Sequence, residues 1–286
     1  MAEKSKDLDD AVSLEKSENG NFILYVSIAD VSHYVKPGSE LFNEAYKKGT
    51  STYPANQVIP MFPFQLSNGI CSLNESEDKL TKTIKIEITP TGKIVDYSIF
   101  KSVIRSNKKM SYEKVNSLLN GIDYNEEYLP FYEILKDMND LSNILEHRRA
   151  KRGCMSLNIA EYEEVEDVYV RERDKAQLMI ENFMILANEI VAKYFEYLDT
   201  FGVYRCHKAP DLDKIYKLKK TLNNLGKFYH TSSIKNPNFF KNLMRDANKN
   251  DLIKENPYFS KILLGSMEKA YFSTINIGHF GLALDE

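Results

Sequence analysis

The chain has 286 residues, of which 43% are hydrophobic and 28% are charged, and its formal net charge at pH 7 is −3. This balance excludes an intrinsically disordered chain and provides enough apolar material for a sizeable core. The lack of a basic excess argues against a dedicated nucleic-acid-binding module, although a whole-chain sum does not exclude a local basic groove in an enzyme.

The first third of the chain is predicted to be rich in β-structure. Residues 22–28 form an apolar run after a turn at residues 19–21, which indicates a buried strand. Residues 83–89 alternate isoleucine with charged side chains, as a half-buried strand does. Pro90-Thr91-Gly92 then leads into a second strand at residues 94–104, which predicts a hairpin.

Helical patterns dominate after Ser111, which we interpret as the N-cap of a helix that ends near Leu119. Helices are then predicted at residues 126–152, where Gly153 ends the pattern, and at residues 174–197, 212–224, 238–248 and 257–270. No linker rich in Pro, Gly or Ser and no internal repeat divides the chain. We therefore predict an α+β fold in one domain, residues 1–286, with a mixed β-sheet followed by packed helices.

The sequence also bears on where the protein works. Residues 1–8 are charged and no apolar stretch approaches the roughly 20 residues of a membrane span, so neither a signal peptide nor membrane association is predicted. Cys71, Cys154 and Cys206 lack CxxC spacing and are odd in number, which is typical of reduced, buried thiols. We expect a cytoplasmic protein, and no obligate protein partner is evident.

The sharpest local feature is Asp7-Leu8-Asp9-Asp10, which places three carboxylates within four residues. Carboxylates this close repel one another unless a cation neutralises them, and Mg²⁺ is held by one or two carboxylates together with substrate phosphate. Two adjacent Mg²⁺ ions can activate water and stabilise the leaving oxygen in phosphodiester hydrolysis. Taken alone, a solvated acidic N-terminus is the simpler interpretation, and the surrounding sequence has to decide.

Eight sequence segments that follow one another in order favour a functional site over a solvated acidic N-terminus. They are "DLDDAV", "IADVSHYV", "GTSTY", "IPMFP", "LSNGICSLN", "IENFMILAN", "YRCHKAP" and "GHFGLAL", and they run from Asp7 to Leu284. In order and spacing they resemble the RNB catalytic domain of the RNase II/RNase R exoribonucleases. The resemblance covers essentially the whole chain.

The resemblance implies 3′→5′ hydrolysis of single-stranded RNA to nucleoside 5′-monophosphates, with Mg²⁺ as cofactor and the RNA 3′ end as partner. It implies that Asp7, Asp9 and Asp10 are metal ligands or hold the attacking water. We expect Asp9 to be the most sensitive of the three. The family's cluster has a further aspartate six residues before Asp7, where this sequence has Met1.

The resemblance also assigns nucleotide-binding residues. Tyr53 matches an aromatic residue that stacks on the 3′-terminal base, where stacking is worth roughly 1–3 kcal/mol per base. The alternative is a loop tyrosine packed beneath its neighbours. Tyr112 and Glu181 match positions close to the terminal nucleotides, and Glu181 is suited to accept a hydrogen bond from a ribose 2′-OH, which distinguishes RNA from DNA. The alternative for Glu181 is a salt-bridge partner on an apolar helix.

Histidines and a basic run need separate interpretation. We interpret His207, which flanks Cys206 in a predicted strand, and His279, in a glycine-flanked turn, as structural hydrogen-bonding groups, since metal-assisted hydrolysis needs no histidine. Residues 148–152 are basic and close a predicted helix. A solvated face favoured by the helix dipole is the simpler interpretation of this run, with contact to an RNA backbone as the alternative.

The family has features with no counterpart in this sequence, and they lead to one further expectation. The family continues after the Gly-His-Phe-Gly-Leu segment into a motif whose arginine neutralises the scissile phosphate, and it carries flanking OB-fold RNA-binding domains, whereas this sequence ends at Glu286. We therefore expect an incomplete catalytic domain with weak or no turnover. Two alternatives stay open: a non-catalytic RNA-binding or scaffolding unit, and a purely structural cation site. RNase R and RNase II types are not distinguished, nor is the oligomeric state.

Overall fold

A computed structural model describes residues 6–54, 58–123, 125–154, 161–165, 167–171, 174–224, 226, 236–249 and 259–284. The chain divides into two compact units. Unit 1 comprises Met1–Ile144 and Asp174–Ala187, and unit 2 comprises Leu145–Arg173 and Asn188–Glu286. Two long helices, α4 (Tyr132–Arg152) and α5 (Lys175–Tyr197), each contribute residues to both units.

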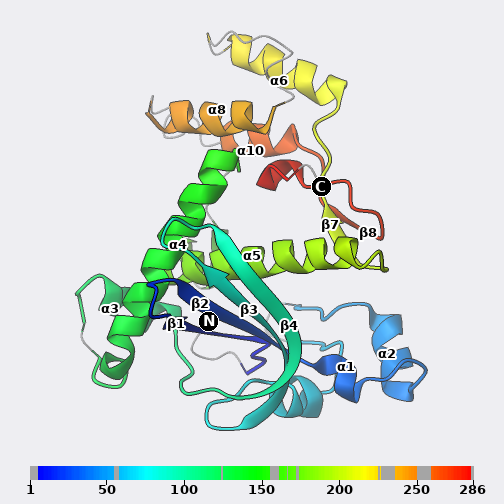
Figure 1. Ribbon diagram of the computed structural model, residues 1–286. Coiled ribbons are helices and arrows are strands. Elements are labelled where there is room, and N and C mark those ends of the chain that lie inside the picture. The colour runs from blue at the N-terminus through cyan, green and yellow to red at the C-terminus, as the bar shows by residue number, and fades with distance from the viewer. Residues whose placement is uncertain are drawn as a thin grey trace. The chain divides into compact units, whose positions relative to one another are not determined.

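Unit 1 is built on a four-stranded antiparallel sheet with strand order β1-β2-β3-β4 (Figure 1). The strands are β1 (Asp10–Lys16), β2 (Phe22–Ala29), β3 (Asp78–Ile88) and β4 (Ile94–Arg105). The predicted strand at residues 22–28 and the predicted hairpin are confirmed, and β3 begins five residues before the predicted start. Ile84, Ile86 and Ile88 are buried, as their alternation predicts.

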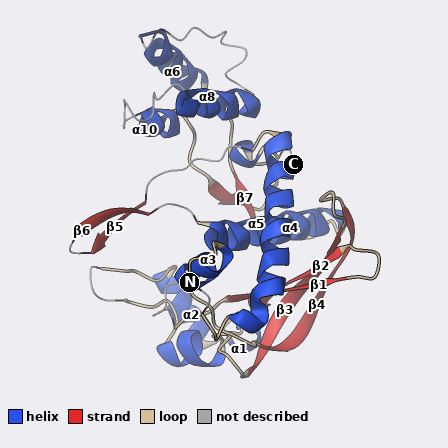
Figure 2. Cartoon of the chain, turned by 90° about the vertical axis from the view of Figure 1, so that its left-hand side faces the viewer, coloured by secondary structure: helices blue, strands red, loops and turns tan. Residues whose placement is uncertain are grey.

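Short helices connect and follow these strands in unit 1. They are α1 (Val31–Tyr34), α2 (Glu40–Lys48), a π-helical turn at Gln65–Ile70, α3 (Tyr112–Leu119) and a 3-10 turn at Leu129–Phe131 that precedes α4. Ser111 is the N-cap of α3 as predicted, and its side chain accepts from the amide of Lys114. Figure 2 shows α3 and α4 on one side of the sheet. The helix predicted from residue 126 begins only at Tyr132, because Pro130 lies in the 3-10 turn.

Unit 2 is largely helical. Its elements are β5 (Glu161–Val165), β6 (Asp167–Arg171), β7 (Tyr204–Cys206), α6 (Leu212–Asn224), α8 (Pro237–Lys249), α10 (Phe259–Gly265), β8 (Tyr271–Ser273) and a 3-10 turn at Phe280–Leu282. Helices predicted at residues 212–224 and 238–248 are confirmed. The helix predicted at 257–270 is shorter where it is described, since α10 ends at Gly265; residues 257–258 lie outside the described residues.

Both units have an apolar core, and the α+β class is confirmed. One buried cluster of unit 1 contains Leu8, Ala29, Val35, Leu66, Cys71 and Leu73. In unit 2 the cluster is formed by Ile215, Leu218, Leu222, Phe239, Phe240, Leu243, Leu263, Met267 and Phe280. All three cysteines are free, with Cys71 and Cys206 buried and Cys154 half-buried. No helix among the described residues is long and apolar enough to cross a membrane.

Candidate active site

The acidic segment lies at the start of β1, and its geometry follows from the single apolar residue within it. Leu8 is 5% exposed and packs in the unit 1 core, whereas Asp7 and Asp9 on either side of it are exposed. Successive side chains of an extended chain point to opposite faces. Burial of Leu8 therefore directs the carboxylates of Asp7 and Asp9 away from the core.

Backbone hydrogen bonds fix the acidic segment in place. The amide of Leu8 donates to Ser72 Oγ at 3.1 Å, and the amide of Leu73 donates to the Leu8 carbonyl at 2.9 Å. The amide of Ala29 donates to the Asp9 carbonyl at 2.9 Å. The segment is thus held from two sides, by the end of β2 and by the stretch that follows the π-helical turn.

The electrostatics of the segment are those of crowded carboxylates. The Asp9 side chain reaches solvent, but the protein around it partly desolvates its carboxylate, which raises the pKa of Asp9 above its ordinary value, and the charges of Asp7 and Asp10 raise it further. Burial also raises the pKa of Asp10, which begins β1 opposite Ile28 of β2. The ionised forms of Asp9 and Asp10 are therefore destabilised relative to isolated carboxylates. A cation bound beside them would reduce that destabilisation.

A buried carboxylate that the sequence did not single out lies beside this segment. Asp30 follows Ala29 directly and is 5% exposed. Its Oδ1 accepts from Ser32 Oγ at 2.6 Å, which lowers the pKa of Asp30 and is opposed by burial, while Lys82 Nζ lies 3.7 Å away. Burial, followed by the charge of Asp9, raises the pKa of the Cys71 thiol, which keeps that thiol in its unreactive protonated form.

A pocket of about 340 Å³ opens within unit 1 next to Asp10. Its lining combines polar residues, among them Asp10, Ser13 and several of the connection from β4 to α3, with apolar ones. The apolar residues come mainly from the helices and include Val115, Phe131, Ile134, Leu135, Met138, Met179 and Ile180. The pocket brings together two of the predicted site residues, Asp10 and Tyr112.

Tyr112 lies in the first turn of α3 and Glu181 in the second turn of α5. Tyr112 is the first residue of α3 and lines the pocket, and Ile180, the residue before Glu181, lines it too. Glu181 itself is half-buried and is not among the pocket-lining residues. Asn116 joins the two helices, because its side chain accepts from the amide of Ala176 at 2.8 Å and donates to Gln177 at 3.1 Å.

Tyr53 lies in the loop after α2 and outside the pocket lining. The loop is closed by the pairing of Thr52 with Ile59, whose amides and carbonyls exchange hydrogen bonds of 2.9 and 2.8 Å. The Tyr53 side chain is 66% exposed. The alternative of a tyrosine packed beneath its neighbours does not fit this exposure, while the stacking role stays a prediction.

The acidic segment offers few protein ligands to a divalent cation. Within the described ranges, no group of three or more His, Cys, Asp or Glu side chains is placed to hold a metal ion. Mg²⁺, however, commonly takes only one or two protein carboxylates and completes its shell with water and substrate phosphate. Exposed carboxylates at Asp7 and Asp9, and the raised pKa of Asp9, fit that mode of binding.

His207 and His279 form a structural pair in unit 2. Their ring centroids lie 5.0 Å apart. His207 Nδ1 accepts from the amide of Gly281 at 3.1 Å, so its Nε2 is the protonated nitrogen that donates to the Glu268 carbonyl at 2.9 Å. His279 Nδ1 accepts from the amide of Leu282 at 3.1 Å. Both rings thus act as neutral hydrogen-bonding groups, which fits the interpretation drawn from the sequence.

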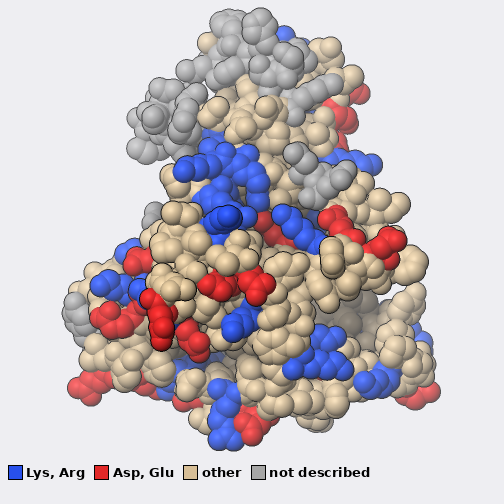
Figure 3. Space-filling model, viewed as in Figure 1, with Lys and Arg blue, Asp and Glu red and all other residues tan. Residues whose placement is uncertain are grey.

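Basic side chains gather over the C-terminal end of α4 (Figure 3). One basic residue of this run, Arg152, is bound by protein groups and not only by solvent. The guanidinium of Arg152 forms a bidentate pair with Glu189 on α5, with Nη1 and Nη2 at 3.0 and 2.6 Å from its carboxylate oxygens. Its Nε donates to the Leu282 carbonyl at 3.1 Å. Arg152 is therefore a structural residue of unit 2 that ties three elements together.

Comparison with known proteins places this arrangement in a family. The family model described as "RNB domain" matches residues 1–286. The chain belongs to the RNB family. Ribonuclease R of Thermotoga maritima is 43% identical over 295 residues, which covers 98% of this chain and 40% of that protein. Ribonuclease R of Escherichia coli is 34% identical over 291 residues, which covers 99% of this chain and 35% of that protein.

Two solved structures share the fold. Mycoplasma genitalium RNase R in complex with ribose-methylated single-stranded RNA superposes with a TM-score of 0.88 at 32% identity, covering 99% of this chain and 45% of that one. Yeast Ssd1, described as a pseudonuclease, superposes with a TM-score of 0.76 at 17% identity, which shows likeness of fold alone. The RNB chain thus spans about two fifths of the length of the ribonuclease R relatives that it matches.

Proposed function

We propose that this RNB chain carries the catalytic site of a 3′→5′ exoribonuclease that hydrolyses single-stranded RNA to nucleoside 5′-monophosphates. The observation that carries the proposal is the anchored acidic segment. Asp7 and Asp9 face outward on either side of buried Leu8, and Asp10 borders the pocket that Tyr112 also lines. Family membership and relatives named ribonuclease R support the choice of RNA as substrate.

Asp7, Asp9 and Asp10 are the residues that would hold Mg²⁺, and the ion would neutralise phosphate charge and lower the pKa of bound water. The protein's own contribution is to place these carboxylates. Leu8 fixes their direction, while Ser72 and Ala29 fix the backbone between them. The carboxylates are also suited to accept hydrogen bonds from an attacking water.

Binding of the RNA 3′ end is assigned to Tyr53, Tyr112 and Glu181. Tyr53 offers a ring that is 66% exposed, on which a base of any sequence can stack. Tyr112 enters from the first turn of α3 at the pocket. Glu181 is proposed to accept from a ribose 2′-OH, which would favour RNA over DNA.

Substitution Asp9→Asn, made in the natural protein that carries this chain, tests the proposal. The amide keeps the size of the side chain but removes its charge. We expect hydrolysis of single-stranded RNA to fall by about a hundredfold or more, equivalent to roughly 2.7 kcal/mol or more of transition-state stabilisation. RNA binding measured in EDTA should be retained. A matched control is Asp96→Asn, an exposed aspartate on β4 paired opposite Glu87.

The alternative is a non-catalytic RNA-binding or scaffolding unit. One observation favours keeping it, namely that the fold is shared with yeast Ssd1, which is described as a pseudonuclease. Under this alternative the wild-type protein binds single-stranded RNA but shows no Mg²⁺-dependent release of nucleotides. Asp9→Asn would then leave every measured property unchanged.

A further inference from the structure

The connection between β4 and α3, residues 106–111, forms one wall of the pocket. Every residue from Arg105 to Tyr112 lines it. The connection is short and leads directly into the N-cap of α3, so its position determines where the Tyr112 side chain starts. An arrangement that fixes this connection would therefore also fix Tyr112 relative to Asp10.

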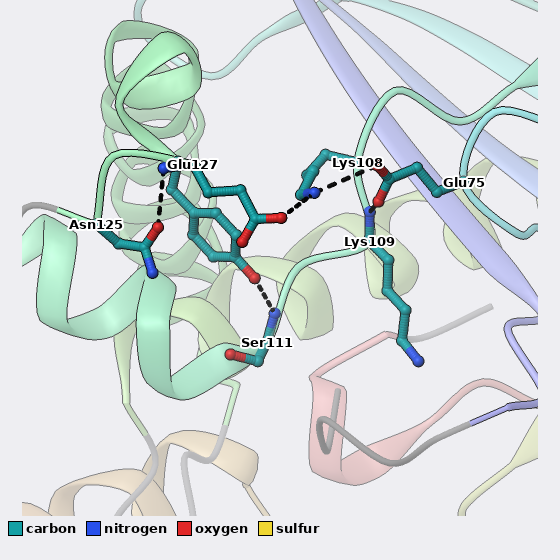
Figure 4. Close-up of polar contacts among 7 residues, drawn as sticks. Glu75, Lys108, Lys109, Ser111, Asn125 and Glu127 are labelled. Atoms are coloured by element: carbon teal, nitrogen blue, oxygen red, sulfur yellow. Dashed lines mark hydrogen bonds and ion pairs between the residues drawn. The ribbon is translucent and has the colours of Figure 1, made fainter.

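Lys108 is the centre of such an arrangement (Figure 4). Its Nζ lies 3.2 Å from Glu75 Oε1 and is also paired with the carboxylate of Glu127. The lysine side chain is 17% exposed, well below the 47% of Lys16 in a pair on the same unit. Both carboxylates come from segments distant in sequence, so the ammonium group links three separate stretches of chain.

Backbone hydrogen bonds reinforce the same connection. Glu75 Oε2 accepts from the amide of Lys109 at 3.0 Å, and the amide of Ser76 donates to the Ser106 carbonyl at 2.8 Å. At the other end, the amide of Ser111 donates at 3.0 Å to the hydroxyl of Tyr128, which is 3% exposed. The carboxylate of Glu75 thus binds both the side chain of one lysine and the backbone of the next.

The stretch that carries Glu75 is the same one that anchors the acidic segment. Ser72 Oγ and the amide of Leu73 hydrogen-bond both backbone groups of Leu8, and Glu75 follows only two residues later. From Asp9 to Tyr112 there is accordingly a continuous path of contacts through the acidic segment, residues 72–75, Lys108 and the first turn of α3. Tyr112, at one end of that path, lines the pocket, and so does Asp10, the residue that follows Asp9 at the other end.

We propose that Lys108 is a positioning residue for the proposed RNA-hydrolysing site. By pairing with Glu75 and Glu127 it holds residues 106–111, and through them Tyr112, in fixed register with the aspartates. The inference rests on the proposed function for its substrate. Lys108 does not act as a phosphate-binding cation, because its charge is already matched by two carboxylates. Those two carboxylates also raise the pKa of Lys108, so it stays charged under all ordinary conditions.

Four variants in the natural protein test this: Lys108→Met, Lys108→Arg, Glu75→Gln and, as control, Lys93→Met. Lys93 is an exposed residue of the β3–β4 turn and makes the same change of charge outside the network. Hydrogen exchange of residues 106–112 reports the hold on the connection without any catalysis. Binding of fluorescent oligoadenylate in EDTA, measured over a range of salt concentration, and steady-state hydrolysis complete the set.

For Lys108→Met we expect exchange in residues 106–112 to accelerate by about twofold to fivefold, the range for loss of a partly exposed ion pair. KM for oligoadenylate should rise by a similar factor while kcat changes less. Lys108→Arg should restore wild-type behaviour, and Glu75→Gln, which keeps an acceptor for the Lys109 amide, should give an intermediate effect. The slope of log affinity against log salt should not change.

Two results would overturn the inference. One is a Lys108→Met protein that matches Lys93→Met in exchange and in KM. The other is a salt slope that is smaller by about one, which would make Lys108 a direct phosphate contact. Failure of the proposed function looks different: the wild-type protein releases no nucleotides, while the exchange measurements still report whether Lys108 holds the connection. Should Lys108→Met fail to fold, Glu75→Gln alone carries the same comparison.

Discussion

The side-chain oxygen of Ser72 accepts a hydrogen bond of 3.1 Å from the amide of Leu8, the one apolar residue inside the acidic segment. Ser72 is 0% exposed, and its own hydroxyl proton can go to the Lys6 carbonyl at 2.9 Å or to Asn74 Oδ1 at 3.0 Å. A buried hydroxyl therefore determines the path of the backbone that presents the aspartates.

Ser72→Ala is predicted to lower the free energy of unfolding by about 1–3 kcal/mol, because it leaves the buried amide of Leu8 without its acceptor. Hydrolysis should weaken as well, since the aspartates lose part of their anchor. Urea unfolding and RNA hydrolysis measure the two effects. Ser67→Ala is the control, because within the described part of the chain the half-buried hydroxyl of Ser67 hydrogen-bonds only to its neighbour Asn68. Equal stability of the two variants would contradict the anchoring role of Ser72.

Tyr53→Ala is predicted to weaken binding of single-stranded RNA by about tenfold, within the roughly 1–3 kcal/mol that a stacked base contributes. Tyr53→Phe keeps the ring and should bind as wild type. Fluorescence anisotropy in EDTA checks both without hydrolysis. Tyr46→Ala is the matched control, since Tyr46 on α2 is 80% exposed but has no assigned contact with RNA. If Tyr46→Ala and Tyr53→Ala weaken binding equally, the stacking role of Tyr53 is wrong.

Two bidentate arginine pairs of similar geometry should differ in their contribution to stability because they differ in burial. Arg152 and Glu189 are 26% and 9% exposed, whereas Arg105 and Asp78 are 65% and 59% exposed. Arg152→Ala leaves a nearly buried carboxylate without its partner and is predicted to cost about 2–4 kcal/mol. Arg105→Ala should change stability little, because exposed pairs are screened by solvent. Thermal unfolding of the two variants measures both losses of stability. Equal losses would contradict the prediction that the more buried pair contributes more.

Because His207 and His279 are neutral in the folded state, we predict that acid lowers the stability of unit 2. Burial, and secondarily the proximity of His207, lowers the pKa of His279 from its ordinary value of 6.5 to about 4. His279 therefore binds a proton less readily in the folded state than in the unfolded state. The contribution of neutral His279 to the free energy of unfolding is fully present above pH 6.5 and is lost as the pH falls towards 4. The charges near the pair are those of Arg205 and Glu268, and Glu268 is paired with Lys214.

His279→Asn tests that acid sensitivity, because an asparagine Oδ1 can still accept from the amide of Leu282 but does not titrate. The variant should lose less stability than wild type between pH 7 and pH 4.5 in thermal unfolding. His147→Asn, at an exposed histidine of α4, is the control and should follow wild type. Parallel pH profiles for wild type and His279→Asn would rule the histidine pair out as the cause.

Local signals predicted much of the fold. The alternation of isoleucines in β3, the Pro-Thr-Gly turn and the cap at Ser111 each act over a few residues, and each is found where it was predicted. The β5–β6 hairpin was not predicted, because β5 is rich in glutamate and the sequence shows no glycine, proline or asparagine between the two strands. Nor did composition mark the division into two units, since α4 and α5 pass from one unit to the other without a linker.

Sequence motifs predicted which residues belong to the candidate site but not the contacts that hold them in place. The aspartates, Tyr53, Tyr112 and Glu181 could be named from motifs, but the burial of Leu8 and the anchoring by Ser72 depend on contacts across more than 60 residues. The same holds for Glu75 and Lys108, which are 33 residues apart. Asp30 could have been noted, because it lies two residues after a predicted buried strand, where residues that bind ligands are often found.

Release of a label from the 3′ end of RNA reports both the direction of hydrolysis and the role of Asp9. An oligoribonucleotide labelled at its 3′ end is incubated with Mg²⁺ and the natural protein carrying this chain, and the same protein with Asp9→Asn is run beside it. We predict that the first labelled product is a nucleoside 5′-monophosphate, and that Asp9→Asn slows its release by about a hundredfold or more. Labelled oligonucleotides from internal cleavage, or equal release by both proteins, would contradict the assignment of these aspartates to 3′→5′ exonucleolytic hydrolysis.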